Sequence, residues 1–336
     1  MSRIYLVTGG AGFIGCSIVR ALLARGDRVR VIDNFSSGRR ENLPAALPTS
    51  PASRKSSSTS TTALEVSEGD ILNADDLKRA MEGVSVVFHH AAIASVPKSV
   101  ADPVFTNEVN VTGTLQVLQA ARSAGVQRVV YAASSSAYGN NPTLPKVESM
   151  APLPQSPYAV TKLAGEFYCR SFYDVYGLQT VSLRYFNVFG PRQDPLSEYA
   201  AVIPRFIAAA LNGKPVVIYG DGEQSRDFCF IDDVVAANLA AVEVADAAGG
   251  MFNIASGRAV SLNALLGALE PIIGRSIARI HEPPRVADVR HSLADITLAR
   301  ATMNYRPTVS LAEGLSRTVD WLRETAPGTT PSAVRI

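Results

Sequence analysis

The chain has 336 residues, of which 47% are hydrophobic, so it can bury a full core as one large α/β domain or as two lobes. Its formal net charge is only +2, and its lysines and arginines are scattered, which argues against a nucleic-acid or membrane surface. No stretch reaches the roughly 18 uninterrupted apolar residues that span a bilayer, and the start resembles a strand instead of a signal peptide. We expect a globular, cytoplasmic protein. Cys16, Cys169 and Cys229 lack metal-ligand or CxxC spacing, which predicts buried reduced thiols and no metal site.

A glycine-rich turn joins the first predicted strand to the first predicted helix. Residues 4–8 form an apolar run, Gly9, Gly12 and Gly15 follow it, and residues 14–24 have helical periodicity. The first glycine permits a tight turn, the second lets the main chain approach a pyrophosphate, and the third lets the helix pack closely on the strand. The N–H groups of the helix N-terminus would then bind the phosphates of a dinucleotide.

The second predicted strand, residues 28–32, ends in Asp33. An acidic side chain about 20 residues after the glycines is placed to hold the ribose hydroxyls of a dinucleotide, and it would repel a 2′-phosphate. This favours NAD over NADP and weakens the alternative of a tight turn that binds nothing. The polar turn 34–40 then either contacts the adenosine half of the cofactor, through Asn34 and Gly38, or is a solvated loop.

Residues 48–62 are rich in serine and threonine and have no apolar periodicity. We expect a mobile surface excursion there, and a modest role as a lid stays open. A strand resumes at residues 64–66, and Asp70 and Ile71 at its end are candidates to flank an adenine ring. An ordinary N-cap of the helix expected near residue 75 is a competing interpretation of Asp70.

Residues 84–89 form a Val-rich run, typical of a strand buried on both faces. His89 ends this run, and a hydrogen-bonded core histidine is a better interpretation of it than a proton-transfer group. Ala91 and Ala92 follow, and their small side chains would let the backbone lie against a ligand.

A long helical pattern covers residues 103–124, with Asn110 inside it, and residues 126–132 form another buried strand. Ser134 lies at the end of that strand. A further helical pattern begins at Tyr158 and runs toward residue 176.

Three residues in these last elements carry the predicted chemistry. Tyr158 and Lys162 are four residues apart on one helix, so they lie on one face of it. The ammonium can stabilise a phenolate and lower the pKa of the tyrosine toward working pH. Ser134, arriving from a strand end, can hydrogen-bond the substrate hydroxyl that loses its proton.

Together these motifs resemble the extended short-chain dehydrogenase/reductase family, and within it the nucleotide-sugar epimerases and dehydratases. The resemblance covers nearly all of the chain outside the Ser/Thr-rich segment and the C-terminal tail, and it continues through residues 183–193, 202–206, 220–228 and 285–292. It implies an α/β fold, with a Rossmann-type doubly wound parallel sheet that binds NAD and a smaller, mostly C-terminal α/β lobe that binds the nucleotide sugar. The implied domains are 1–183, with part of 228–250 returning to it, and 184–336.

The resemblance also implies roles for individual residues. Tyr158 is the base, Lys162 holds the nicotinamide ribose, and Ser134 contacts the sugar 4-hydroxyl. The implied cofactor-binding residues are Gly9, Gly12, Phe13, Ile14, Gly15, Asp33, Asn34, Gly38, Asp70, Ile71, Ala91, Ala92, Asn110, Tyr158 and Lys162. The implied substrate-binding residues are Ser95, Ser134, Ser135, Ser136, Tyr158, Asn187, Val202, Tyr219, Arg226, Arg285, Asp288 and Ser292.

Four of these residues are matched to the substrate diphosphate. Asn187 falls where the family contacts it, Arg226 and Arg285 match the family's phosphate-binding arginines, and Asp288 matches the residue that orients the second arginine. Arginine is suited to bidentate phosphate capture. Without the resemblance, Arg285 would be interpreted as a solvated arginine.

Three reactions share this scaffold in the family: 4-epimerisation, 4,6-dehydration, and oxidation coupled to decarboxylation. The dehydratases carry Asp-Glu directly after the serine or threonine, and the decarboxylases carry a Glu in the same turn. This chain has Ser135 and Ser136 there, and hydroxyls cannot supply that acid–base chemistry at neutral pH. We therefore expect a 4-epimerase. A non-catalytic NAD-binding protein would be expected to have lost the tyrosine or the lysine.

The serine triplet and residues 95–99, 202–204 and 288–292 look most like the bacterial epimerases that act on UDP-N-acetylglucosamine and UDP-N-acetylgalactosamine. Ser292 falls where a tyrosine in this family narrows the pocket to glucose and galactose, so the serine leaves space beside carbon 2. We expect the N-acetylated sugar to be accepted along with UDP-glucose and UDP-galactose. Lys98 could instead meet a carboxylate, which keeps UDP-glucuronic acid and other nucleotide sugars open.

The helical patterns 103–124 and 158–176 form an intersubunit four-helix bundle in related enzymes, which suggests a homodimer. Packing on the sheet explains their apolar residues equally well. Beyond the UDP-sugar and a second copy of the chain, we expect no nucleic-acid or membrane partner.

Overall fold

The computed structural model describes residues 3–44, 63–195, 201–284 and 289–325. The Ser/Thr-rich segment 48–62 and the predicted substrate-binding residues Arg285 and Asp288 lie outside these ranges.

A seven-stranded parallel sheet lies at the centre of the molecule, with the strand order β11-β6-β5-β4-β1-β2-β3. The strands are β1 Ile4–Thr8, β2 Arg28–Asp33, β3 Leu64–Glu68, β4 Val86–His89, β5 Arg128–Ser134, β6 Gln179–Tyr185 and β11 Met251–Ile254. The order reverses between β1 and β4, which is where doubly wound sheets bind ligands beyond the carboxyl ends of their strands. The predicted Rossmann-type sheet is confirmed.

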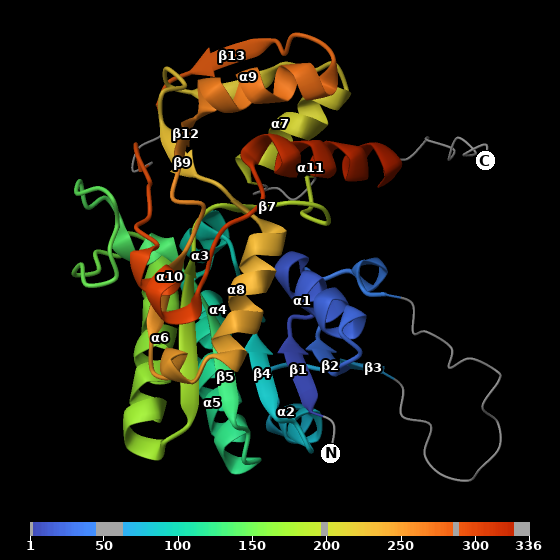
Figure 1. Ribbon diagram of the computed structural model, residues 1–336, viewed down its shortest axis with the longest axis vertical. Coiled ribbons are helices and arrows are strands. Elements are labelled where there is room, and N and C mark those ends of the chain that lie inside the picture. The colour runs from blue at the N-terminus through green and yellow to red at the C-terminus, as the bar shows by residue number, and fades with distance from the viewer. Residues whose placement is uncertain (1–2, 45–62, 196–200, 285–288, 326–336) are drawn as a thin grey trace, which may run out of the picture.

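Helices cover both faces of the sheet (Figure 1). On one face lie α1 Phe13–Ala24 and α8 Ile231–Glu243, and on the other lie α2 Ala74–Met81, α5 Gly113–Ser123 and α6 Pro157–Tyr176. Alternate strand residues point to opposite faces, so Val7 joins one buried apolar cluster and Leu6 joins the other. Helix α6 begins where the Ser156 hydroxyl accepts a hydrogen bond from the amide of Ala159, and it ends at Gly177.

The predicted helical stretch 103–124 is confirmed, and it contains a π-helical turn that the sequence did not predict. Helix α4, Pro103–Asn107, leads into a π-helical turn, Glu108–Thr112, before α5 begins. Asn110 in this turn is 2% exposed, and its amide bonds the main chain of Ile93 and the hydroxyl of Thr161. These tertiary hydrogen bonds accompany the widened turn, and apolar periodicity gives no sign of them.

A smaller group of elements lies above the carboxyl edge of the sheet (Figure 1). Helices α7 Val202–Leu211, α9 Leu262–Ile273 and α11 Leu311–Thr325 pack together there. Short strands pair around them, namely β7 Val188–Phe189 with β10 Cys229–Phe230, β8 Val216–Tyr219 with β13 Arg279–Glu282, and β9 Ser225–Asp227 with β12 Ala259–Ser261. Helices α3 Val96–Ala101 and α10 Thr297–Met303 complete the fold.

The three cysteines are buried and unpaired, as predicted. In the described parts of the chain, no helix is both long enough and apolar enough to cross a membrane.

Candidate active site

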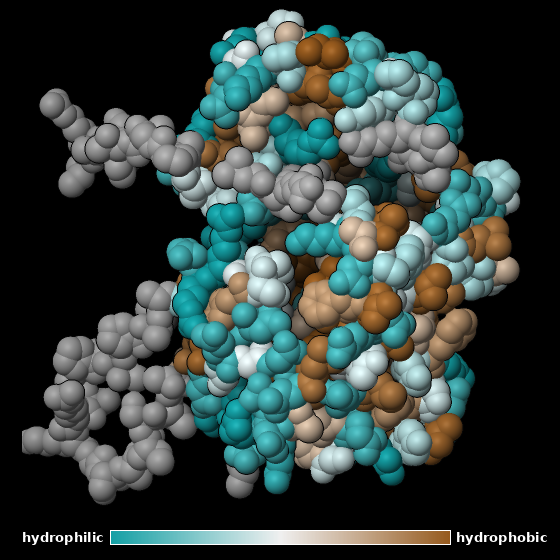
Figure 2. Space-filling view, turned by 180° about the vertical axis from the view of Figure 1, so that it is seen from behind, coloured by the Kyte–Doolittle hydropathy of each residue, from teal (hydrophilic) through white to brown (hydrophobic). Residues whose placement is uncertain are grey.

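A cleft of about 1540 Å³ runs along the carboxyl edge of the sheet, beneath the smaller group of elements. Figure 2 shows the surface hollowed between these two parts of the molecule. With the exception of Asn110, every residue predicted to bind the cofactor lines this cleft: Gly9, Gly12, Phe13, Ile14, Gly15, Asp33, Asn34, Gly38, Asp70, Ile71, Ala91, Ala92, Tyr158 and Lys162. Asn110 instead braces the loop after β4 through its hydrogen bonds to Ile93.

The glycine turn has the close packing that its sequence predicts. Gly9 has φ +66°, and a Cβ there would lie 2.7 Å from the amide nitrogen of Ala91. A Cβ on Gly15 would collide with the carbonyl oxygen of Gly9. Helix α1 follows with Gly12 as its N-cap and no side-chain cap, so its first N–H groups are open to an anion such as a dinucleotide phosphate.

The carboxylate of Asp33 is fixed at the edge of the cleft. It is 7% exposed, and it accepts hydrogen bonds from the amides of Ala11 (2.9 Å) and Phe35 (2.8 Å). Next to it, the Asn34 amide donates to the carboxylate of Asp70 (2.9 Å). A buried carboxylate beside an uncapped glycine turn matches what the ribose and phosphates of NAD require, so these residues fit that cofactor.

The three predicted catalytic residues converge at the end of β5. The Lys162 ammonium is 5% exposed, donates to the carbonyl oxygen of Ala132 (2.9 Å) and lies 5.2 Å from the ring centre of Tyr131. Tyr158, one turn earlier on α6, lies near the side chain of Ser134, which acts to lower the pKa of the phenol.

The electrostatics of this cluster differ from the sequence-based expectation in one respect. Burial raises the pKa of Tyr158, and the side chain of Ser134 opposes only part of that rise. The expected net lowering of the tyrosine pKa is therefore wrong for this structure, because desolvation disfavours the phenolate. Burial also lowers the pKa of Lys162, to about 8.

The turn after Ser134 carries hydroxyl groups and no carboxylate. The Ser134 hydroxyl oxygen accepts hydrogen bonds from the amide (3.2 Å) and the hydroxyl (2.9 Å) of Ser136. Residues Ser135–Tyr138 form a short 3-10 turn that holds this arrangement. The turn itself offers hydrogen bonds and no general acid or base of carboxylate type.

His89 is a buried core residue, as predicted. Its two ring nitrogens bond the hydroxyls of Thr8 (2.8 Å) and Thr114 (3.0 Å). Burial lowers the pKa of His89 to about 3, so the ring is neutral at physiological pH.

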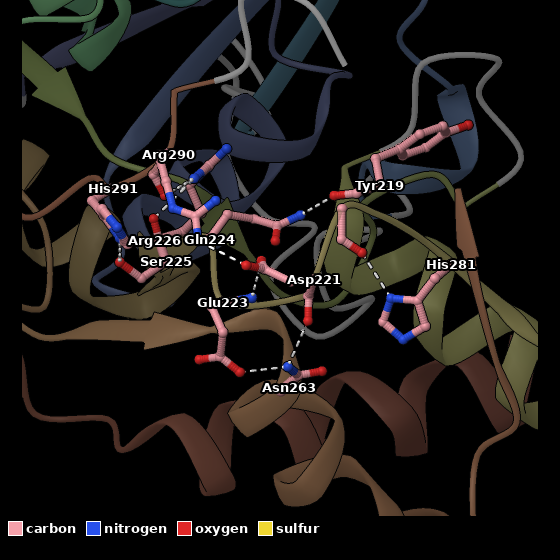
Figure 3. Close-up of polar contacts among 11 residues, drawn as sticks. Tyr219, Asp221, Glu223, Gln224, Ser225, Arg226, Asn263, His281, Arg290 and His291 are labelled. Carbon is pink, nitrogen blue, oxygen red and sulfur yellow. Dashed lines mark hydrogen bonds and ion pairs between the residues drawn. The ribbon is translucent and has the colours of Figure 1, made fainter. Parts of the chain in front are cut away.

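Four of the predicted substrate-binding residues, Asn187, Val202, Tyr219 and Arg226, line an adjoining pocket of about 280 Å³. Ala201 lines both this pocket and the larger cleft. Figure 3 shows Arg226 held by the main chain: its guanidinium donates to the carbonyl oxygens of Ser225 (2.9 Å) and Arg290 (3.2 Å).

The remaining predicted substrate residues lie elsewhere. Ser134, Ser135 and Ser136 form the turn described above, and neither they nor Ser95 and Ser292 line the two cavities. Ser95 caps helix α3 by accepting a hydrogen bond from the amide of Lys98 (3.3 Å). The amide of Ser292 donates to the carbonyl oxygen of Ser225 (3.0 Å), which fixes the segment beside Arg226.

Glu166 and Arg184, next to this site, were not predicted from the sequence. They form an ion pair between α6 and β6 with side chains 6% and 3% exposed. Two signals in the sequence point to the pair: Glu166 follows Lys162 at helical spacing, and Arg184 interrupts an apolar strand, where a charge needs a partner.

Known proteins resemble the chain over almost its full length. The UDP-glucose 4-epimerase of Mycolicibacterium smegmatis is 41% identical over 320 residues, which cover 95% of this chain and 98% of that protein. The structure of a UDP-N-acetylglucosamine 4-epimerase from Methanobrevibacter ruminantium, in complex with UDP-N-acetylmuramic acid, is similar with a TM-score of 0.88 and 40% identity, covering 96% of this chain and 99% of that one. A UDP-glucose 4-epimerase from Thermus thermophilus, in complex with NAD, has a TM-score of 0.84 and 36% identity, covering 96% and 99%.

The family model for NAD dependent epimerases and dehydratases matches residues 5–255, which include the glycine turn, the serine turn and the Tyr158–Lys162 helix. The predicted resemblance is thereby confirmed. The chain belongs to the NAD dependent epimerase/dehydratase family, and its cofactor is NAD.

Proposed function

We propose that this protein inverts carbon 4 of a UDP-hexose, and that UDP-N-acetylglucosamine and UDP-N-acetylgalactosamine are its preferred pair, with UDP-glucose and UDP-galactose also accepted. The observation that carries the reaction class is the serine turn. Ser134 is hydrogen-bonded within it by Ser136, and Ser135 and Ser136 supply no carboxylate to eliminate water. A ketone formed at carbon 4 is then most simply reduced again.

The proposed reaction balances without an external oxidant. Bound NAD supplies the acceptor, and later the donor, of the hydride from carbon 4. Tyr158 takes the proton of the 4-hydroxyl and returns it, Ser134 orients that hydroxyl, and the Lys162 ammonium stabilises the phenolate and holds the nicotinamide ribose. Rotation of the 4-keto sugar between the two transfers would expose its other face and yield the inverted alcohol.

We propose that the cleft-lining residues, from the glycine turn to Lys162, bind NAD. They belong to a domain of residues 1–183, which part of 228–250 rejoins. The nucleotide sugar would lie across the adjoining pocket in the region 184–336. There Arg226 and Asn187 are suited to the diphosphate, because a guanidinium held by main-chain oxygens is already oriented for it.

The preference for N-acetylated sugars is supported by Ser292. Its main chain is tied to Ser225, next to Arg226, and its side chain is short. A tyrosine at this position would occupy the space that an acetamido group on carbon 2 requires. That a UDP-N-acetylglucosamine 4-epimerase is among the similar structures agrees with this choice.

A second candidate substrate is UDP-glucuronic acid. Lys98 lines the large cleft, where its ammonium could pair with a sugar carboxylate. Comparison of rates decides between the two candidates.

We further propose that the protein is a cytoplasmic homodimer. Apolar side chains are exposed on α3, α4 and α6, namely Val100, Val104, Phe105, Val160 and Phe167. Figure 2 shows apolar groups on this side of the sheet. A second copy covering them would remove these side chains from water.

The proposed function is tested by incubating the purified protein and NAD separately with UDP-N-acetylgalactosamine, UDP-galactose and UDP-glucuronic acid, and following the products by NMR. We expect interconversion at carbon 4 without net NADH, fastest for the N-acetylated sugar. A 4-keto-6-deoxy product or release of carbon dioxide would refute the reaction. Fastest turnover of UDP-glucuronic acid would refute the substrate and favour the second candidate.

A further inference from the structure

A buried ion pair lies directly behind the catalytic cluster. Arg184 of β6 donates two parallel hydrogen bonds to the carboxylate of Glu166 on α6, from Nε to Oε1 (2.8 Å) and from Nη2 to Oε2 (2.7 Å). The two side chains are 3% and 6% exposed. Because Glu166 lies one helical turn after Lys162, its carboxylate faces the same side of α6 as the ammonium.

Several groups surround the Lys162 ammonium. The Tyr131 ring and the carbonyl oxygen of Ala132 face it from β5, and Tyr158, Glu166 and Cys169 share its helix. His89 and His90 approach it from the end of β4 and the residue after it.

Of these titratable groups, Glu166 supplies the negative charge. Burial lowers the pKa of both histidines to about 3 and raises the pKa of Cys169 to about 12, so all three are neutral at physiological pH. Burial also raises the pKa values of Tyr131 and Tyr158. For Glu166, the hydrogen bonds and charge of Arg184 oppose the rise that burial causes. Burial lowers the pKa of Lys162, and the interactions of the ammonium with Cys169 and then with Glu166 oppose that effect.

The same pair also supports the serine turn. The Arg184 guanidinium lies 4.6 Å from the ring centre of Tyr138, the last residue of that turn. The Tyr138 hydroxyl in turn donates to the side chain of Asn253 on β11 (2.7 Å). Arg184 therefore links Glu166 to the element that carries Ser134.

We propose that Glu166 is a positioning residue for the reaction: held by Arg184, its carboxylate keeps Lys162 charged and directed toward the site. This inference rests on the proposed function only in assigning Lys162 to catalysis. If Glu166 merely fills space or stabilises the fold, the charge of Lys162 will not depend on it.

The test measures the titration of Lys162 itself. The chain has six lysines, so a protein labelled with 13C at lysine Cε gives few NMR signals, and the Lys162 signal is assigned with K162M. In the wild type we expect this signal to titrate near pH 8. In E166Q the ammonium loses its anion, so its pKa should fall by about one unit or more. The alkaline limb of the kcat profile should move in the same direction.

Two further variants separate this role from a structural one. E166D keeps the charge and should restore most of the wild-type titration. The double variant E166Q/R184Q leaves no buried charge without its partner, and it also removes the Arg184 cation, whose repulsion lowers the Lys162 pKa, so its Lys162 titration should lie between those of E166Q and the wild type. D221N, which breaks the exposed pair between Asp221 and Arg290, is the control and should not move the Lys162 signal.

An unchanged Lys162 titration in folded E166Q would overturn the proposal, even if thermal stability fell. The outcome is independent of substrate identity. A shifted titration in a protein that converts no UDP-sugar would refute the proposed function and leave the coupling of Glu166 to Lys162 intact.

Discussion

Two of the arginine–carboxylate ion pairs in the molecule lie in opposite surroundings, one buried and one exposed. Arg184 and Glu166, between α6 and the sheet, are 3% and 6% exposed, whereas Arg290 and Asp221, in the segments beside Arg226, are 63% and 53% exposed. Water screens the second pair, so it contributes little to stability, while the first must stay paired because each charge has lost its hydration. The distance between the partners, 2.7 Å and 2.8 Å, does not reveal this difference.

The regions around Lys162 and Arg226 differ in burial in the same way as these two ion pairs. Around Lys162, side chains are fixed by buried contacts to β5 and β6. Around Arg226, short segments are joined by main-chain hydrogen bonds and exposed side chains (Figure 3). Changes in this second region can alter substrate choice at little cost to the fold.

The largest effect should come from the buried region. In Tyr158→Phe, no base takes the proton of the 4-hydroxyl, so kcat should fall by about 100- to 10,000-fold when the products are followed by NMR. The thermal midpoint is the control for folding and should stay close to that of the wild type. A decrease of less than about tenfold would assign the proton transfer to another group.

Breaking the buried pair should have the next largest effect. Arg184→Met leaves the Glu166 carboxylate buried without its partner, so the free energy of unfolding in urea should fall by about 3–5 kcal/mol. Burial raises the pKa of Glu166 and Arg184 opposes that rise, so in the variant protonation should occur at higher pH. A group with a raised folded-state pKa favours folding at low pH, and the deficit should shrink as the pH falls. A deficit independent of pH would indicate lost packing instead.

A substitution in the exposed region should change the choice between substrates. Ser292→Tyr should reduce turnover of UDP-N-acetylgalactosamine relative to UDP-galactose by about 10- to 200-fold, because the ring competes with the acetamido group. The ratio of the two kcat/KM values measures this effect. Equal losses on both substrates would show that the residue does not set the width of the pocket.

The smallest effect should come from the exposed pair. Asp221→Asn removes the partner of Arg290, and we expect the thermal midpoint to stay within measurement error at physiological salt. The thermal midpoints of Asp221→Asn and Arg184→Met should be compared at the same protein concentration. A comparable loss in the two variants would contradict the distinction drawn from burial.

The sequence predicts the sheet and the cofactor cleft well because both depend on local features. Glycines at fixed spacing, an acidic residue after the second strand and a Tyr–Lys pair on one helix face each impose a geometry without reference to the rest of the chain. Tertiary hydrogen bonds are not encoded in this way, so the π-helical turn around Asn110 and the pairing of Glu166 with Arg184 became evident only in the fold.

The pKa of Tyr158 is the property that the sequence predicted least well. A lysine one turn from a tyrosine suggests a lowered tyrosine pKa, but the sign depends on how strongly the site desolvates the phenolate. In the structure Lys162 donates to Ala132, and burial dominates at Tyr158. Helical spacing alone gives the neighbours of a residue and not its hydration.

The proposed inversion is tested directly by following the hydrogen on carbon 4. UDP-N-acetylglucosamine carrying deuterium at carbon 4 is incubated with the protein and NAD, and the product is examined by NMR and mass spectrometry. We expect UDP-N-acetylgalactosamine that retains the deuterium at carbon 4, since the same hydride is returned to the opposite face. Loss of the deuterium to solvent, or a product altered at another carbon, would contradict the proposed inversion.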